Sequence, residues 1–147
     1  MGSVLEAGYA VELRTPDLDD YMRLRESAGL TPFLRSTAEV GLNGTIFAIV
    51  IVYDRKVVGM GRLIGDGGCF FQVTDIAVDP DHQGRGLGKL IMAGIMEYVD
   101  SELPKTAYVS LIADVPANKL YEKVGFKETA PRSVGMSYIV GRQGIHS

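Results

Sequence analysis

The segment VDPDHQGRGLGKL (Val78–Leu90) places three glycines at alternate positions directly before an amphipathic, helix-forming stretch. A glycine in an ordered element costs about 0.5–1 kcal/mol relative to alanine, so three of them indicate a requirement on the backbone. The first turn of a helix carries unpaired N–H groups and the positive end of the helix dipole, and glycines let an anion approach them closely. Arg85 and Lys89 add positive charge. The pattern predicts a cradle for a phosphate or diphosphate, with a solvated glycine-rich turn as the alternative.

Three familiar phosphate-binding or metal-binding motifs do not fit this segment. A dinucleotide-binding G-x-G-x-x-G would need its third glycine where Lys89 stands. A P-loop would need a glycine at Gln83 and a serine or threonine at Leu90. A calcium loop that begins at Asp79 would need its bidentate glutamate at Leu90. What remains is a general anion site at the start of a helix.

The hydrophobic pattern around this segment switches between strand and helix periods. The expected strands lie within residues 9–14, 45–53, 57–65, 69–78, 107–113, 126–130 and 135–140. The expected helices lie within residues 15–29, 35–44, 87–103 and 116–126. The first helix is expected to have Thr15 as its N-cap and Pro16 as its first residue. Strands on either side of the long helix predict a parallel, right-handed crossover. The fold class is therefore α/β, with an antiparallel meander that leads into the crossover.

The composition limits the classes of function. The length of 147 residues predicts a single domain over residues 1–147. A net charge of −3 without a long basic run argues against a nucleic-acid partner. The longest apolar run, Thr45–Tyr53, is too short to span a bilayer, so no membrane association is expected. Cys69 is the only cysteine, which favours a reducing, cytoplasmic location. No His, Cys or carboxylate residues have the spacing of metal ligands, so no metal is expected.

Two motifs resemble the GNAT superfamily of N-acetyltransferases. QGRGLG (Gln83–Gly88) matches the Q/R-x-x-G-x-G/A signature of that family, with the usual VDP just before it. NKLYEKVGF (Asn118–Phe126) is similar to the family's later helix, in the family's order and spacing. Gly135 and Met136 give a weaker resemblance to the serotonin-acetyltransferase-like branch. The resemblance implies a mixed, mainly antiparallel sheet flanked by helices, with a splayed parallel strand pair at the cofactor site.

The resemblance also implies a function and a set of cofactor contacts. The expected reaction moves the acetyl group of acetyl-CoA to a primary amine, by direct attack in a ternary complex. The acceptor is then a small-molecule amine or an amine of a protein or peptide, and a homodimer would fit the habit of the family. The signature amides would bind the pyrophosphate, and the preceding strand would pair with the pantetheine arm. The expected acetyl-CoA contacts are Ile76, Ala77, Val78, Gln83, Gly84, Arg85, Gly86, Leu87, Gly88, Lys89, Asn118 and Tyr121.

Tyr121 is the expected general acid, because the tyrosine of this motif lies beside the sulfur of CoA in the family. The general base is open among three candidates. Asp75 is the first, although strand alternation puts it on the opposite face from Gln72 and Thr74 unless a bulge intervenes. Asp114, at the end of the next strand, is the second. Water without a dedicated base is the third.

Two non-catalytic functions would use the same anion cradle. The domain could bind CoA as a sensor without turnover, or it could be a regulator that binds another nucleotide diphosphate. Turnover of acetyl-CoA with an amine separates the enzyme from both. A comparison of acetyl-CoA with ATP and ADP separates the two binding functions from each other.

Overall fold

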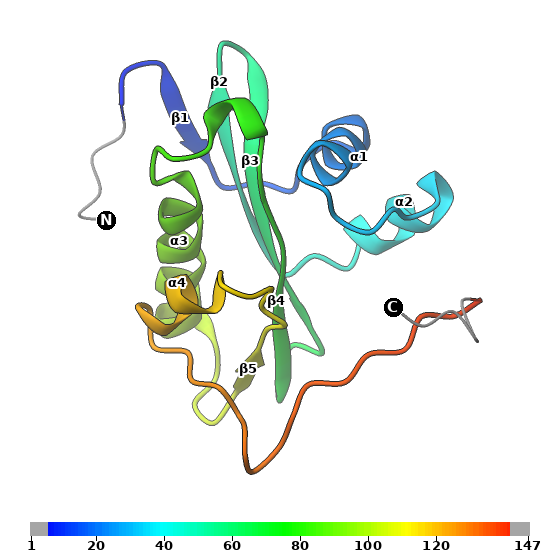
Figure 1. Cartoon of the computed structure of the whole chain (residues 1–147), viewed down its shortest axis with the longest axis vertical. Helices are drawn as coiled ribbons and strands as arrows, with labels where there is room; N and C mark the ends of the chain where they lie inside the picture. The colour runs from blue at the N-terminus through cyan, green and yellow to red at the C-terminus, as the bar shows by residue number, and fades with distance from the viewer. Residues whose placement is uncertain (1–5, 142–147) are drawn as a thin grey trace.

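The computed structural model describes residues 6–141 and shows one five-stranded sheet with helices on both faces (Figure 1). The strands are β1 (Tyr9–Glu12), β2 (Phe47–Tyr53), β3 (Lys56–Gly65), β4 (Phe70–Val78) and β5 (Tyr108–Ser110). Their order in the sheet follows the sequence. The strands β1 to β4 pair antiparallel, and β4 pairs in parallel with β5. The predicted α/β class, the meander and the crossover are therefore confirmed.

The helices lie in pairs on the two faces of the sheet (Figure 1). They are α1 (Leu18–Ser27) and α2 (Arg35–Leu42) on one face, and α3 (Leu87–Glu102) and α4 (Asn118–Glu122) on the other, with a 3-10 turn, η1 (Pro80–His82), before α3. The larger apolar cluster joins α3 to the sheet, and the smaller one joins α1 and α2 to it. Because both faces are covered, β2 and β3 are apolar almost without alternation.

The predicted start of the first helix is wrong. The helix α1 begins at Leu18 with Asp17 as its N-cap, rather than at Pro16 with Thr15 as the cap. The first helical hydrogen bond runs from the Tyr21 N–H to the Asp17 carbonyl, which fixes the cap at Asp17. Pro16 is buried ahead of the helix instead. Asp17 has the extended backbone of an N-cap, with a φ of −64° and a ψ of 153°, and the start at Leu18 puts Asp19 and Asp20 in the first turn, where acidic side chains are favourable.

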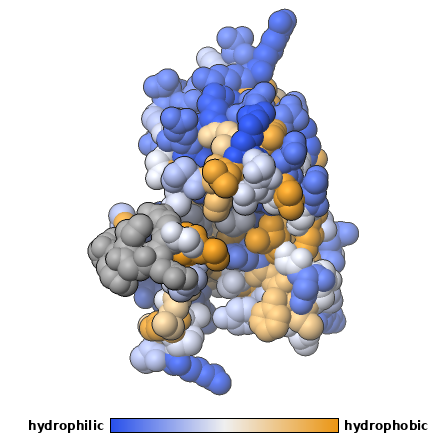
Figure 2. Space-filling model, turned by 90° about the vertical axis from the view of Figure 1, so that its right-hand side faces the viewer, coloured by the Kyte–Doolittle hydropathy of each residue, from blue (hydrophilic) through white to orange (hydrophobic). Residues whose placement is uncertain are grey.

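The strands expected within 126–130 and 135–140 do not form. The strand β5 has three residues, so the edge of the sheet offers few backbone partners to a further strand. The segment instead runs past this edge (Figure 1) and leaves Val134, Met136 and Val140 exposed by 67%, 88% and 87%. On the face shown in Figure 2, hydrophobic residues gather around the middle of the face, below a mostly hydrophilic top. An alternating sequence is thus not sufficient for a strand where no partner edge is available.

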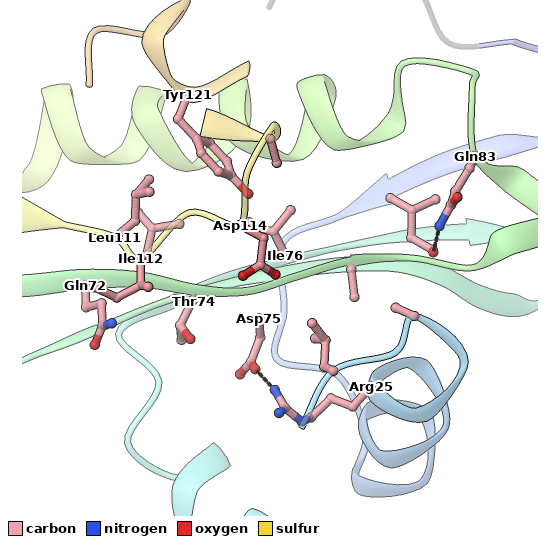
Figure 3. Close-up of a pocket in the computed structure, with 16 residues that line it drawn as sticks. Arg25, Gln72, Thr74, Asp75, Ile76, Gln83, Leu111, Ile112, Asp114 and Tyr121 are labelled. Carbon is pink, nitrogen blue, oxygen red and sulfur yellow. Dashed lines mark hydrogen bonds and ion pairs between the residues drawn. The ribbon is translucent and has the colours of Figure 1, made fainter. Parts of the chain in front are cut away.

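The strand β4 contains a β-bulge. Between two regular pairs, one residue of β3, Gly61, faces two residues of β4, Asp75 and Ile76. Asp75 has a φ of +59°, in the left-handed region. The bulge puts the Asp75 side chain on the same face as Thr74, toward α1, whereas Ile76 points to the other face (Figure 3). The exception that the sequence analysis left open, an intervening bulge, is therefore present.

Gly61 lies against α3 with no room for a side chain. A Cβ at this position would lie 2.6 Å from Ile91 Cγ2 and 2.9 Å from Ile95 Cδ1. We expect Gly61→Ala to lower the free energy of unfolding by about 1–3 kcal/mol, because overpacking moves α3 off the sheet. Urea denaturation measures the change. In the control Gly41→Ala, on exposed α2, nothing lies within 4 Å of the added Cβ, and alanine should stabilise the helix. Equal effects of the two substitutions would contradict the packing argument.

Candidate active site

The strands β4 and β5 diverge after a short stretch of pairing. The last of their three pairs joins Gln72 to Ser110, and β4 continues beyond it to Val78. A cavity of about 350 Å³ opens at this divergence (Figure 3). Residues 72–78 of β4 line one wall, and residues of α1, of the chain after β5 and of α4 complete it. This is the splayed parallel pair that the sequence resemblance implies.

The three β4 residues that were expected to meet a pantetheine arm all border the cavity. The Ile76 side chain packs into the core under α3, and the Ala77 side chain packs into the core under α1. Their backbone is therefore what they can offer to a ligand. The Val78 carbonyl accepts a hydrogen bond of 3.1 Å from Nε2 of Gln83, which also borders the cavity. An extended ligand with amide groups can pair with a strand edge of this kind.

At the position of the expected anion cradle, the backbone before α3 is open. Gly84 and Gly86 both have a φ of +79°, and a Cβ added to either would meet nothing within 4 Å. Gly86 is the N-cap of α3, and no side chain caps the helix. Leu87 is buried in the core and Gly88 has no side chain, so both offer only backbone groups. The first amides of α3 have no intrahelical acceptor, which suits a diphosphate.

The two basic side chains of the cradle are exposed and lie outside the cavity lining. Nη1 of Arg85 lies 3.0 Å from Oε2 of Glu6, and this hydrogen bond is the main cause that raises the pKa of the guanidinium. A phosphate would compete with Glu6 for Arg85. Lys89 lies in the first turn of α3, where a cation can reach an anion bound to the helix amides.

Tyr121 projects from α4 into the cavity from the side opposite β4 (Figure 3). Burial is the main cause that raises the pKa of its phenol, and the negative charge of Asp114 adds to the effect. The hydroxyl therefore keeps its proton at neutral pH and can act as a donor. Asp114, the second candidate for the general base, borders the same cavity and lies between Tyr121 and β4 in the view of Figure 3.

Asn118, one helical turn before Tyr121, has an unsatisfied polar atom. Its Nδ2 donates to Oε2 of Glu128 at 3.3 Å. Its Oδ1 is buried and has no hydrogen-bond partner among the described residues. A buried acceptor without a donor costs about 1–3 kcal/mol, which a ligand N–H would recover. Asn118 is not among the residues that line the cavity, so its contact with a ligand stays a prediction.

Asp75, the first candidate for the general base, is held by three donors. Its carboxylate accepts hydrogen bonds from Tyr21 and from Arg62, each of 2.7 Å, and a third from Arg25. Burial is the main cause that raises the pKa of Tyr21 to about 12, so that hydroxyl donates throughout the neutral range. Asp75 therefore anchors α1 to the bulge of β4, and its oxygens are occupied by protein donors.

Sequence reasoning missed Tyr21, Arg25 and Arg62 as partners of Asp75. For Arg62 a signal was present, because a charged residue inside the apolar run 57–65 must find a buried partner. For Arg25 no comparable signal was present, since it lies 50 residues before Asp75, on an amphipathic helix. Only the bulge brings the two side chains together.

Over residues 6–141, no three His, Cys, Asp or Glu side chains gather in a way that would hold a metal ion. In the same range, no helix combines the length and the apolar character that are needed to cross a membrane.

A family model described as an acetyltransferase (GNAT) domain matches residues 44–128, which is more than half of the chain. Among solved structures, one from meticillin-resistant Staphylococcus aureus is described as a protein of unknown function and probable acetyltransferase. It is 45% identical to this chain, with a TM-score of 0.84, and the match covers 89% of this chain and 98% of that chain.

The curated relatives are more distant. An uncharacterized N-acetyltransferase, ycf52, of Gracilaria tenuistipitata var. liui is 25% identical over 75% of this chain. The match covers 62% of that protein, so this chain spans less than two thirds of its length. The alanine N-acetyltransferase for ribosomal protein bS18 of Haemophilus influenzae is 22% identical, over 80% of both proteins.

Proposed function

Because this chain belongs to the GNAT superfamily of N-acetyltransferases, we propose that it transfers the acetyl group of acetyl-CoA to a primary amine while both substrates are bound. The observation that carries the proposal is the splay of β4 and β5 between the open start of α3 and Tyr121. One extended ligand can contact all three parts. The acceptor amine would enter the same cavity from its other end.

The described groups match the parts of acetyl-CoA in order. The open amides around Gly86 suit its diphosphate, and the free edge of β4 suits the two amides of the pantetheine arm. Asn118, whose Oδ1 is buried without a partner, lies one helical turn from Tyr121 but outside the cavity lining. Tyr121 then stands where the thioester end would lie, within the cavity.

The proposed reaction begins with the loss of a proton from the acceptor. An alkylamine with a pKa of about 10.4 is mostly protonated at neutral pH, so the proton goes to Asp114 or to water in the cavity. Asp75 does not take this proton in the proposed reaction, because its oxygens accept hydrogen bonds from Tyr21 and from two guanidinium groups. The neutral nitrogen attacks the thioester carbon, and a new C–N bond forms.

The second half of the reaction breaks the C–S bond. The nitrogen loses its second proton to water, and the departing thiolate takes the phenolic proton of Tyr121; the resulting phenolate recovers a proton from solvent. In the tetrahedral intermediate, a backbone N–H of the β4 edge is available to stabilise the oxyanion.

The test is release of free thiol from acetyl-CoA, measured across small amines, amino acids, polyamines, aminoglycosides and peptide N-termini. We expect thiol release that depends on an amine, with the N-acetyl product identified by mass spectrometry. Binding of acetyl-CoA without such release would indicate a sensor. Binding of ATP or ADP as tight as that of acetyl-CoA would indicate a nucleotide-binding regulator.

Gly86→Val should weaken acetyl-CoA binding by about tenfold to a hundredfold, the equivalent of one or two hydrogen bonds to a charged group. The valine side chain would fill the open space beside the first amides of α3. Calorimetric titration measures the Kd. Gly67→Val is a matched control, because Gly67 also has a positive φ (+85°) and open surroundings but lies in the turn before β4. If the two folded variants had equal Kd values for acetyl-CoA, the proposal that the backbone around Gly86 binds the donor would be contradicted.

A further inference from the structure

Arg25, Arg62 and Asp75 form a buried charged cluster beside the cavity, with exposures of 8%, 5% and 9%. Nη1 of Arg62 lies 2.7 Å from one carboxylate oxygen of Asp75, and Nη1 of Arg25 binds the other. The hydroxyl of Tyr21 donates to the same carboxylate and stays neutral, because burial raises its pKa to about 12. Two positive charges in the cluster are thus matched by one negative charge. An excess charge in a buried place is costly unless an anion accompanies it.

All three guanidinium nitrogens of Arg62 donate hydrogen bonds, whereas one nitrogen of Arg25 does not. Arg62 donates through all three nitrogens, to a hydroxyl, a backbone carbonyl and Asp75, at 2.7–2.9 Å. Arg25 donates to Asp75 and to the Thr31 carbonyl, while its buried Nε has no partner within the part of the chain that the structure describes. Arg25 lines the cavity, and Arg62 is not among the lining residues. The residue with the unpaired donor therefore lies at the cavity wall.

The rest of the cavity limits what can meet Arg25. Its volume of about 350 Å³ is at the small end for ligand pockets and must also hold the thioester end of the donor. The carboxylates in its lining are Asp75, which is already paired, and Asp114. Arg25 and Tyr121 border it from opposite sides of β4 (Figure 3). A long polycation would find too little room and too few carboxylates.

We infer that Arg25 binds an anionic group of the acceptor, so that the acceptor is a small amine that also carries a carboxylate or a phosphate. The guanidinium edge pairs with oxygens of either group through charge-assisted hydrogen bonds. The bound anion balances the cluster and occupies Nε of Arg25, while the amine lies in the cavity that Tyr121 borders. The inference rests on the proposed acetyl transfer and names its substrate class.

The experiment compares three acceptors that share one carbon skeleton. One is an amino acid, one is the amine that remains when its carboxylate is removed, and one is the amine with a phosphate in place of the carboxylate. Steady-state acetylation gives kcat/KM for each acceptor. Acceptor binding is measured separately, as the shift in melting temperature in the presence of CoA, so that it does not depend on turnover. We expect both readouts to favour an anionic acceptor by about tenfold or more in kcat/KM and by a larger thermal shift. The acidic acceptor with the higher kcat/KM shows whether the site prefers a carboxylate or a phosphate.

Two variants assign this preference to Arg25. Arg25→Gln should raise KM for the acceptor with the acidic group by about tenfold to a hundredfold, and should change KM for the amine without that group much less. The Kd of acetyl-CoA should stay nearly constant. Arg62→Gln removes the same charge from the same cluster but keeps Arg25 in the cavity lining, so the preference should fall less than in Arg25→Gln although stability falls. If Arg25→Gln does not fold, Arg25→Lys carries the test, because an ammonium group cannot reproduce the planar donor edge and KM should still rise.

Two outcomes would overturn the inference. One is a wild-type enzyme that acetylates the amine without an acidic group as well as it acetylates the amino acid or the phosphate-bearing amine. The other is a folded Arg25 variant that retains the preference. Failure of the proposed function looks different, since no amine would then release thiol. In that case the thermal shift still tests the anion site. A shift that is lost in Arg25→Gln and kept in Arg62→Gln would support an anion site at Arg25. No shift in the wild type would contradict one.

Discussion

Replacement of Tyr121 by phenylalanine should lower kcat by about 10²–10⁴-fold while the Kd of acetyl-CoA stays nearly constant. The substitution keeps the ring that packs beside the core under α3 and removes only the proton donor. A donor that acts as the sulfur departs stabilises the transition state more than the ground state, so kcat carries the loss. Steady-state kinetics with an acceptor from the amine screen and calorimetry with acetyl-CoA measure the two quantities.

The pH dependence gives the same prediction a second readout. The pKa of Tyr121 is raised above its usual 10.0, mainly by burial, so the acid is present below that pKa and is lost as the pH rises through it. The wild type should therefore lose kcat on the alkaline side, and Tyr121→Phe should lack that part of the profile. Tyr108→Phe is the control, because Tyr108 is exposed by 52% and does not line the cavity. Full activity of Tyr121→Phe with a lowered melting temperature would give Tyr121 a packing function only.

Asp75→Asn should lower the free energy of unfolding by about 3–5 kcal/mol, the usual cost when one partner of a buried ion pair is removed. The amide has nearly the same shape, but its NH₂ group would face a guanidinium donor, and both Arg25 and Arg62 would remain buried without their carboxylate. Urea denaturation of both proteins measures the difference.

The control for this prediction is an ion pair of the same type on the surface. Asp19→Asn removes the partner of Arg35, but the Asp19 side chain is 85% exposed, so the stability should change little. A small effect of Asp75→Asn would mean that the cluster relaxes without cost. A loss of kcat without a loss of stability would return Asp75 to the position of general base.

The backbone geometry of the candidate donor site was largely predictable from sequence because it is local. The open backbone at Gly84 and Gly86 is a property of consecutive residues, and the helix that follows supplies the amides. Tyr121 could be assigned only through the resemblance, since a half-buried tyrosine by itself is more often a packing residue. The crossover followed from the order of strand, helix and strand.

The other half of the site depends on contacts between distant residues. A bulge moves every side chain beyond it to the opposite face of the sheet. The alternating pattern of the strand did not indicate a bulge at Asp75. The pairing of Asp75 with Arg25 on α1 and Arg62 on β3 follows from that change. The residues within 135–140 had a strand pattern as well, but strand formation needs a partner edge, which a sequence pattern does not contain.

The contact between the bulge and α1 joins a part of the chain that the family model covers to a part that it does not. The cradle, the β4 edge and Tyr121 lie inside residues 44–128, which match the family model, whereas Arg25 lies on α1, before that range. The ion pair between Asp75 and Arg25 connects these two parts of the chain. If Arg25 binds the acceptor as we infer, a copy that arises by gene duplication could acquire a new acceptor through changes in α1 and the loop after it, with the proposed donor site intact. For enzyme engineering, the same ion pair marks where N-terminal segments of related chains can be exchanged, provided that a partner for Asp75 comes with them.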